Sequence, residues 1–100
     1  MSSIRIEGTI QARRTLTVLQ DPLVKQFTIN RINILSGKLP GVFLTEVWFD
    51  DNKKFIPWAQ KIEKLVSLKD LTLPANTKLK LVFRNDNQSP VNLIIEIEGK

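Results

Sequence analysis

Apolar and mostly polar residues alternate with a period of two in the last quarter of the chain. The pattern runs from Lys78 to Phe83 and again from Val91 to Ile97, and the residues from Asn85 to Pro90 between the two runs are turn formers. Strict alternation on both sides of such a break is typical of an antiparallel hairpin with one buried face. The sequence therefore predicts that these two segments pair as neighbouring strands.

The charges favour one register for this hairpin. Opposite charges meet on the outer face in the pairs Lys78 with Glu98 and Lys80 with Glu96. Three apolar pairs then lie on the inner face, namely Leu79 with Ile97, Leu81 with Ile95 and Phe83 with Leu93. A slip of one residue would turn every side chain to the other face, so this register is expected over its neighbours.

The same register places Val82 beside Ile94 on the outer face. An apolar pair among charged residues indicates a subunit contact. The plainer alternative is two scattered surface aliphatics, which are common on monomeric proteins.

The rest of the chain also favours short strands. Alternating or β-branched runs occupy residues 3–12, 15–19, 27–34, 42–49 and 71–73. The inward parity changes around Asn30 and Arg31, which predicts a bulge or a change of face there. Helical spacing competes only over residues 57–66, where one or two helical turns are expected at most after Pro57.

Seven or eight short strands separated by turn formers predict an all-β fold, an antiparallel β-sandwich formed by one domain over residues 1–100. A closed barrel of the OB type is the alternative for this length. The OB alternative needs fewer strands and a more aromatic and basic face than this sequence offers.

Composition limits the chemistry. The chain contains no Cys and no His, so it lacks the commonest zinc ligands and the commonest general base near neutral pH. Carboxylate pairs such as Asp50 and Asp51 lack the spacing of a calcium loop. We therefore expect no enzyme activity, no metal and no cofactor. The N-terminus lacks the apolar stretch of a signal peptide and no run is long enough to cross a bilayer, which predicts a soluble product made in a cytoplasm.

A net charge of +5, carried largely by the first forty residues, leaves binding of nucleic acid open. Trp58 with Arg13 and Arg14 forms the candidate site for single-stranded nucleic acid or a glycan. Trp48 lies in a nearly continuous apolar run, which is more typical of a core residue than of a stacking platform. The basic residues are mostly scattered, so a merely soluble basic surface is the simpler interpretation.

A series of strand-like segments and turns follows one another along most of the chain, namely Phe27–Asn30, Arg31–Leu35, Phe43–Asp50, Phe55–Pro57, Leu71–Asp86 and Val91–Glu98. This order of segments resembles small single jelly-roll domains of virion structural proteins. Cupredoxin-like and carbohydrate-binding sandwiches share much of this order, but the chain lacks the His and Cys ligands of a copper site.

The resemblance implies a jelly-roll-like sandwich and a non-enzymatic structural role as a capsid, vertex or decoration component located in a virion. Such a protein acts as a homo-oligomer or binds other structural subunits. The candidate contact residues are Val82, Ile94, Ile56 and Trp58. A small binding module for a glycan or single-stranded nucleic acid is the alternative.

Overall fold

The computed structural model describes residues 2–37, 39–54, 60–62 and 70–100, which form nine strands. In chain order the strands are β1 (Ser2–Ile10), β2 (Thr15–Gln20), β3 (Phe27–Ile34), β4 (Val42–Phe49), β5 (Asn52–Lys54), β6 (Gln60–Lys61), β7 (Thr72–Leu73), β8 (Leu79–Asn85) and β9 (Val91–Gly99). The all-β prediction is confirmed.

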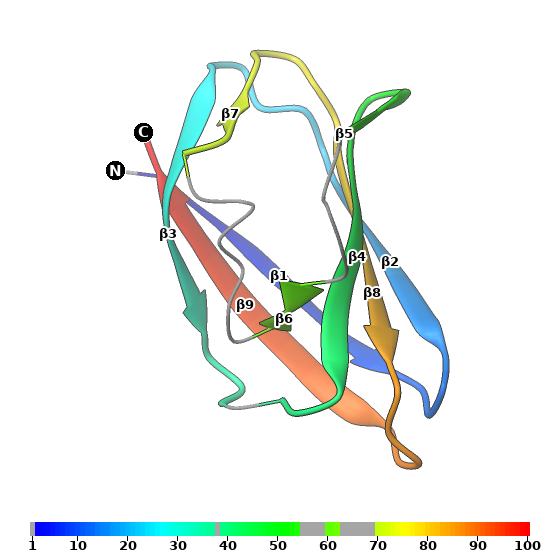
Figure 1. Cartoon of the computed structure of the whole chain (residues 1–100). Helices are drawn as coiled ribbons and strands as arrows, with labels where there is room; N and C mark the ends of the chain where they lie inside the picture. Colours follow the sequence, from blue (N-terminus) through cyan, green and yellow to red (C-terminus); the bar gives the residue numbers. More distant parts are fainter. Residues whose placement is uncertain (1, 38, 55–59, 63–69) are drawn as a thin grey trace.

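The strands form two antiparallel sheets that face each other (Figure 1). One sheet has the order β1-β9-β3-β7, and the other has the order β2-β8-β4-β5, with β6 also paired to β4. Because β5 and β6 are both short and share one edge of β4, the sandwich has eight strand positions, which agrees with the expected seven or eight.

The pairing is nested along the chain. β1 pairs with β9, β2 with β8, β3 with β7, and β4 with β5 and β6. A chain folded back on itself in this way and rolled into two layers is the arrangement of a jelly roll. The predicted jelly-roll-like sandwich is therefore the observed architecture.

The predicted hairpin between the last two long strands is wrong. β8 pairs with β2 and β4 in one sheet, whereas β9 pairs with β1 and β3 in the other. The connection from Asp86 to Pro90 thus crosses between the layers. Alternation reports that each strand has one buried face, but it does not report which strand is its neighbour, and both arrangements bury the same side chains.

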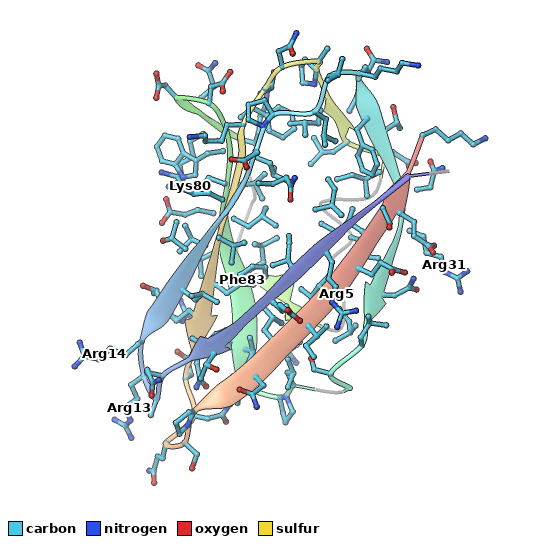
Figure 2. The ribbon with its side chains drawn as sticks, turned by 180° about the vertical axis from the view of Figure 1, so that it is seen from behind. Arg5, Arg13, Arg14, Arg31, Lys80 and Phe83 are labelled. Carbon is cyan, nitrogen blue, oxygen red and sulfur yellow. The ribbon has the colours of Figure 1, made fainter. Side chains whose placement is uncertain are left out.

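The predicted ion pairs of the hairpin fail for the same reason. Glu96 stands opposite Arg5 of β1 and Asn33 of β3, and the Asn33 amide donates to its carboxylate at 3.5 Å. Figure 2 shows Lys80 on the outer side of one sheet and Arg5 on the outer side of the other, with Phe83 between the layers. Glu98, for its part, stands opposite Arg31 of β3 rather than opposite Lys78.

Alternate residues of both sheets meet in one core. The buried apolar side chains of the described residues are Ile4, Ile6, Ile10, Phe27, Ile29, Val42, Leu44, Val47, Phe49, Ile62, Leu73, Leu79, Leu81, Phe83, Leu93, Ile95 and Ile97. Burial of a side chain of this size contributes about 1.5–3 kcal/mol relative to its exposure, so this interlayer cluster is the main source of stability.

Two bulges adjust the strands that lie inside the sheets. In β3 the register with β9 shifts between Ile29 and Arg31, which confirms the predicted irregularity at Asn30. In β4 the register with β8 shifts between Leu44 and Glu46, and the hydroxyl of the extra residue, Thr45, donates to the Val82 carbonyl at 3.1 Å. Each extra residue restores the inward parity of the apolar side chains that follow it.

The expected helical turn over residues 57–66 lies mainly outside the described residues. Within that span Gln60 and Lys61 form β6, whose partners in β4 are Leu44 and Phe43.

Candidate interaction surfaces

The outer side of the β2-β8-β4-β5 sheet carries a group of apolar side chains. We call this group, formed by Leu19 of β2, Val82 of β8, and Phe43 and Trp48 of β4, the aromatic face. The four side chains project outward because their strand neighbours on the other parity fill the core. Leu19 is 57% exposed, and the other three are half-buried. An apolar surface of this kind is suited to contact with another protein.

Polar groups surround the Trp48 ring. Lys80 Nζ lies 4.3 Å from the ring centroid and Lys53 Nζ lies 5.9 Å from it. The indole nitrogen donates to Glu46 Oε1 at 3.0 Å, and the same oxygen is 3.7 Å from Lys53 Nζ. One carboxylate therefore joins the indole and a lysine, while a second lysine lies over the ring as a cation–π partner.

Phe43 has a similar environment. The guanidinium carbon of Arg84 lies 5.0 Å from the Phe43 ring centroid, and Arg84 Nε also donates to Asp86 Oδ1 at 2.8 Å. Both aromatic rings of the face are thus contacted by cations of the same chain. A base or sugar could stack on that side of either ring only after the cation had moved away, and this disfavours a stacking role for the face.

The position of Trp48 corrects the expectation that it belongs to the core. Trp48 stands opposite Lys80 of β8 and Lys53 of β5, on the outer side of the sheet. The apolar run around Trp48 hid the alternation, because its two inward neighbours, Val47 and Phe49, are equally apolar.

Val82 and Ile94 lie on opposite outer sides of the sandwich. Val82 stands opposite Thr17 and Glu46, whereas Ile94 stands opposite Glu7 in the other sheet. Both side chains are half-buried. The prediction that they are cross-strand neighbours is wrong because the hairpin that would join them does not form. A role for each of them in a subunit contact stays a prediction.

The two arginines of the alternative binding site lie in the turn between β1 and β2. Arg13 has a φ of 57°, and the Arg14 N–H donates to the Gln11 carbonyl at 3.1 Å. Both side chains are exposed and point away from one end of the sandwich (Figure 2). Ile56 and Trp58 lie outside the described residues, so the structure does not test whether Trp58 and the arginines form one site.

One buried polar residue was not singled out from the sequence. Asn85 ends β8 at an inward position and is fully buried. Its side-chain nitrogen donates to the carbonyls of Ile10 at 3.1 Å and Ser89 at 2.9 Å, and its oxygen accepts from the Asn87 N–H at 2.9 Å. Its signal in the sequence is a polar residue that continues the inward parity of Leu79, Leu81 and Phe83. The role of Asn85 is to connect two loops.

The acidic pair considered for calcium also has a structural explanation. Asp50 Oδ1 accepts the Lys78 N–H at 2.9 Å, and the Asp50 N–H donates to the Lys78 carbonyl at 2.9 Å. Asp50 therefore closes the end of the β4–β8 ladder. Among the described residues, no group of three or more acidic side chains is placed to hold a metal ion.

No family model, curated protein or solved structure matches this chain. Within the described ranges, no helix has the length and apolar character needed to cross a membrane.

Proposed function

We propose that this protein is a non-enzymatic structural subunit that assembles with copies of itself, as a capsid, vertex or decoration component of a virion. The observation that carries this proposal is the aromatic face on a jelly-roll sandwich. Side chains such as Leu19 and Trp48 form an outward apolar surface that a subunit contact would remove from water.

The cations on this face support assembly over ligand stacking. Lys80 and Arg84 lie against the two aromatic rings, so the rings are already partly covered within the chain. Lys53 pairs with Glu46 beside Trp48, so polar and apolar side chains adjoin on this face, as they do in protein interfaces. Symmetric repetition would then allow a modest contact in each subunit to stabilise a large assembly.

The mass of the protein in solution tests this proposal. Static light scattering and native mass spectrometry, from micromolar to millimolar concentration, should give a defined oligomer whose population rises with concentration. Electron microscopy of the same samples would show whether closed particles form. A monomer at every concentration, in low and in physiological salt, would contradict the proposal.

The alternative is a binding module that uses Arg13 and Arg14, and their exposure at one end of the sandwich favours testing it. Tryptophan fluorescence should be followed while a single-stranded oligonucleotide or an oligosaccharide is added. Oligonucleotide binding that weakens with salt and is lost in the double variant Arg13→Ala/Arg14→Ala would support the nucleic-acid module. A response to sugar that does not depend on salt would support glycan binding. No response to either ligand favours assembly.

A further inference from the structure

The free edge of β2 differs from the other sheet edges. β2 has the sequence TLTVLQ, with no charged residue and no proline, and among the described strands it ends the order β2-β8-β4-β5. β1, at an edge of the other sheet, contains Arg5 and Glu7, and β5 contains two lysines. β7 has two residues and is followed by Pro74. Charges, prolines and short length are the usual means of blocking an edge, and β2 has none of them.

The free hydrogen-bonding groups of β2 can be assigned from its ladder with β8. The Asn85 N–H donates to the Arg14 carbonyl at 2.9 Å, so these residues turn their backbone groups toward each other. Because an antiparallel ladder alternates, Leu16, Val18 and Gln20 turn their backbone groups toward β8.

The other three residues of β2, Thr15, Thr17 and Leu19, consequently turn their N–H and C=O groups to the free edge. The pairing of β8 with β4 leads to the same assignment. The Asp50 N–H donates to the Lys78 carbonyl at 2.9 Å, so Lys78 turns its backbone groups toward β4. The next residue, Leu79, therefore turns its backbone groups toward β2. All three side chains are exposed. β2 also forms the outermost ribbon of its sheet in both views (Figures 1 and 2).

We propose that the β2 edge pairs with the β2 edge of a second copy across a twofold axis at Thr17, so that one sheet runs through both subunits. This inference deepens the proposed function, on which it rests, by assigning the first contact of the assembly. In this register Thr15 and Leu19 stand opposite each other and Thr17 meets its own copy. The residues with free backbone groups are thereby the residues that pair, and each pair exchanges both hydrogen bonds.

The side chains agree with this register. Leu16 stands opposite Val18 on the inner face, where both side chains already pack on the edge of the core. Arg13 precedes β2 by two residues and Asp21 follows it by one. The register therefore brings Arg13 of one copy toward Asp21 of the other, and twofold symmetry repeats this opposite-charge pair. A second copy of the chain therefore fits the edge in both hydrogen bonding and charge.

A proline at Thr17 tests the edge with little change to the subunit. Thr17→Pro removes an N–H that faces away from β8, and proline is tolerated at such edge positions. Thr17→Val, which keeps the N–H and the branched shape, is the matched control. Thr17→Pro should raise the dissociation constant of the dimer by about tenfold or more, and Thr17→Val should leave it within about twofold. Circular dichroism and thermal unfolding check that both variants fold.

Charge exchange tests the register. Arg13→Asp places two acidic side chains opposite each other across the contact between the two copies, and Asp21→Arg places two basic side chains there. The double variant restores opposite charges. In low salt each single variant should dimerise more weakly than the wild type, and the double variant should recover the wild-type constant. Within one chain these residues lie at opposite ends of β2, so recovery cannot come from an internal ion pair.

The outcomes separate this inference from the proposed function. A wild-type oligomer whose dissociation constant is unchanged in Thr17→Pro and in Arg13→Asp would overturn pairing at β2 and leave the structural role in place. A wild-type protein that is monomeric at every concentration would overturn both. Loss of assembly in Thr17→Pro together with recovery in the double charge variant would establish the β2 contact and its register.

Discussion

The side-chain nitrogen of Asn85 donates a hydrogen bond of 3.1 Å to the main-chain oxygen of Ile10. This bond joins the end of β8 in one sheet to the end of β1 in the other. With its bonds to Ser89 and Asn87, Asn85 also satisfies polar groups of the loop between β8 and β9.

Asn85→Ala should lower the free energy of unfolding by about 2–3 kcal/mol, because several buried polar groups lose their partner. Asn85→Asp has nearly the same shape, but the ionised carboxylate cannot donate to the carbonyls, so it should also be destabilising at neutral pH. Urea unfolding measures both variants. Asn92→Ala is the control: it removes an exposed amide of β9 that accepts a hydrogen bond of 2.9 Å from the Thr9 hydroxyl, and it should lower the free energy of unfolding by only about 0.5–1 kcal/mol. Equal effects of the Asn92 and Asn85 variants would contradict the role of Asn85.

Two inward glycines should respond differently to alanine. A Cβ on Gly99 would overlap the main-chain oxygen of Thr28 and press on the Phe27 ring. A Cβ on Gly8 would meet only the end of the Leu16 side chain, at 2.8 Å, and that side chain can rotate.

Gly99→Ala should therefore destabilise the protein by about 1–3 kcal/mol, the usual cost of overpacking. Gly8→Ala should cost clearly less, because a flexible side chain can move and because alanine reduces the entropy of the unfolded chain. The difference between their midpoints of thermal unfolding checks this prediction. A larger loss for Gly8→Ala would mean that Leu16 cannot adjust.

The cation–π contact between Lys80 and Trp48 predicts an energetic coupling. Lys80→Met keeps most of the aliphatic side chain and removes the charge, so it should destabilise the protein by about 0.5–1 kcal/mol. A double-mutant cycle with Trp48→Leu, measured by urea unfolding, isolates this contact. When Trp48 has already been replaced by Leu, Lys80→Met should leave the free energy of unfolding unchanged. A cycle without coupling would show that Lys80 contributes only through its aliphatic chain.

Val82 and Ile94 should now behave as separate surface positions. The proposed function places an assembly contact on the aromatic face, in addition to the pairing at the β2 edge, so Val82→Glu should reduce the size of the assembly measured by light scattering. Ile94→Glu changes the opposite side of the sandwich and should leave that size unchanged. Both variants should remain folded, since each residue is only half-buried. Reduced assembly in Ile94→Glu alone would move the contact to the other sheet.

The sequence predicted the buried faces of individual strands well. Leu79, Leu81 and Phe83 are all buried, as alternation indicated. The irregularity at Asn30 was also visible, because a change of inward parity requires an extra residue. Alternation failed at Trp48, where both sides of the strand carry apolar residues. The candidate surfaces were predicted less well than the buried faces. The sequence placed Val82 and Ile94 in one patch, whereas they lie on opposite outer sides of the sandwich.

Local chemistry thus determined where the strands lie and which side of each strand is buried, because the period of two acts within a single segment. Only the tertiary structure decided that β8 and β9 belong to different layers, since one buried face per strand is satisfied equally by a hairpin and by a crossing between sheets. Strand partners depend on contacts between distant segments, such as Asn85 with Ile10. For that reason the free edge of β2 and the aromatic face, which define the surfaces of the protein, were decided by the rolled arrangement of the whole chain.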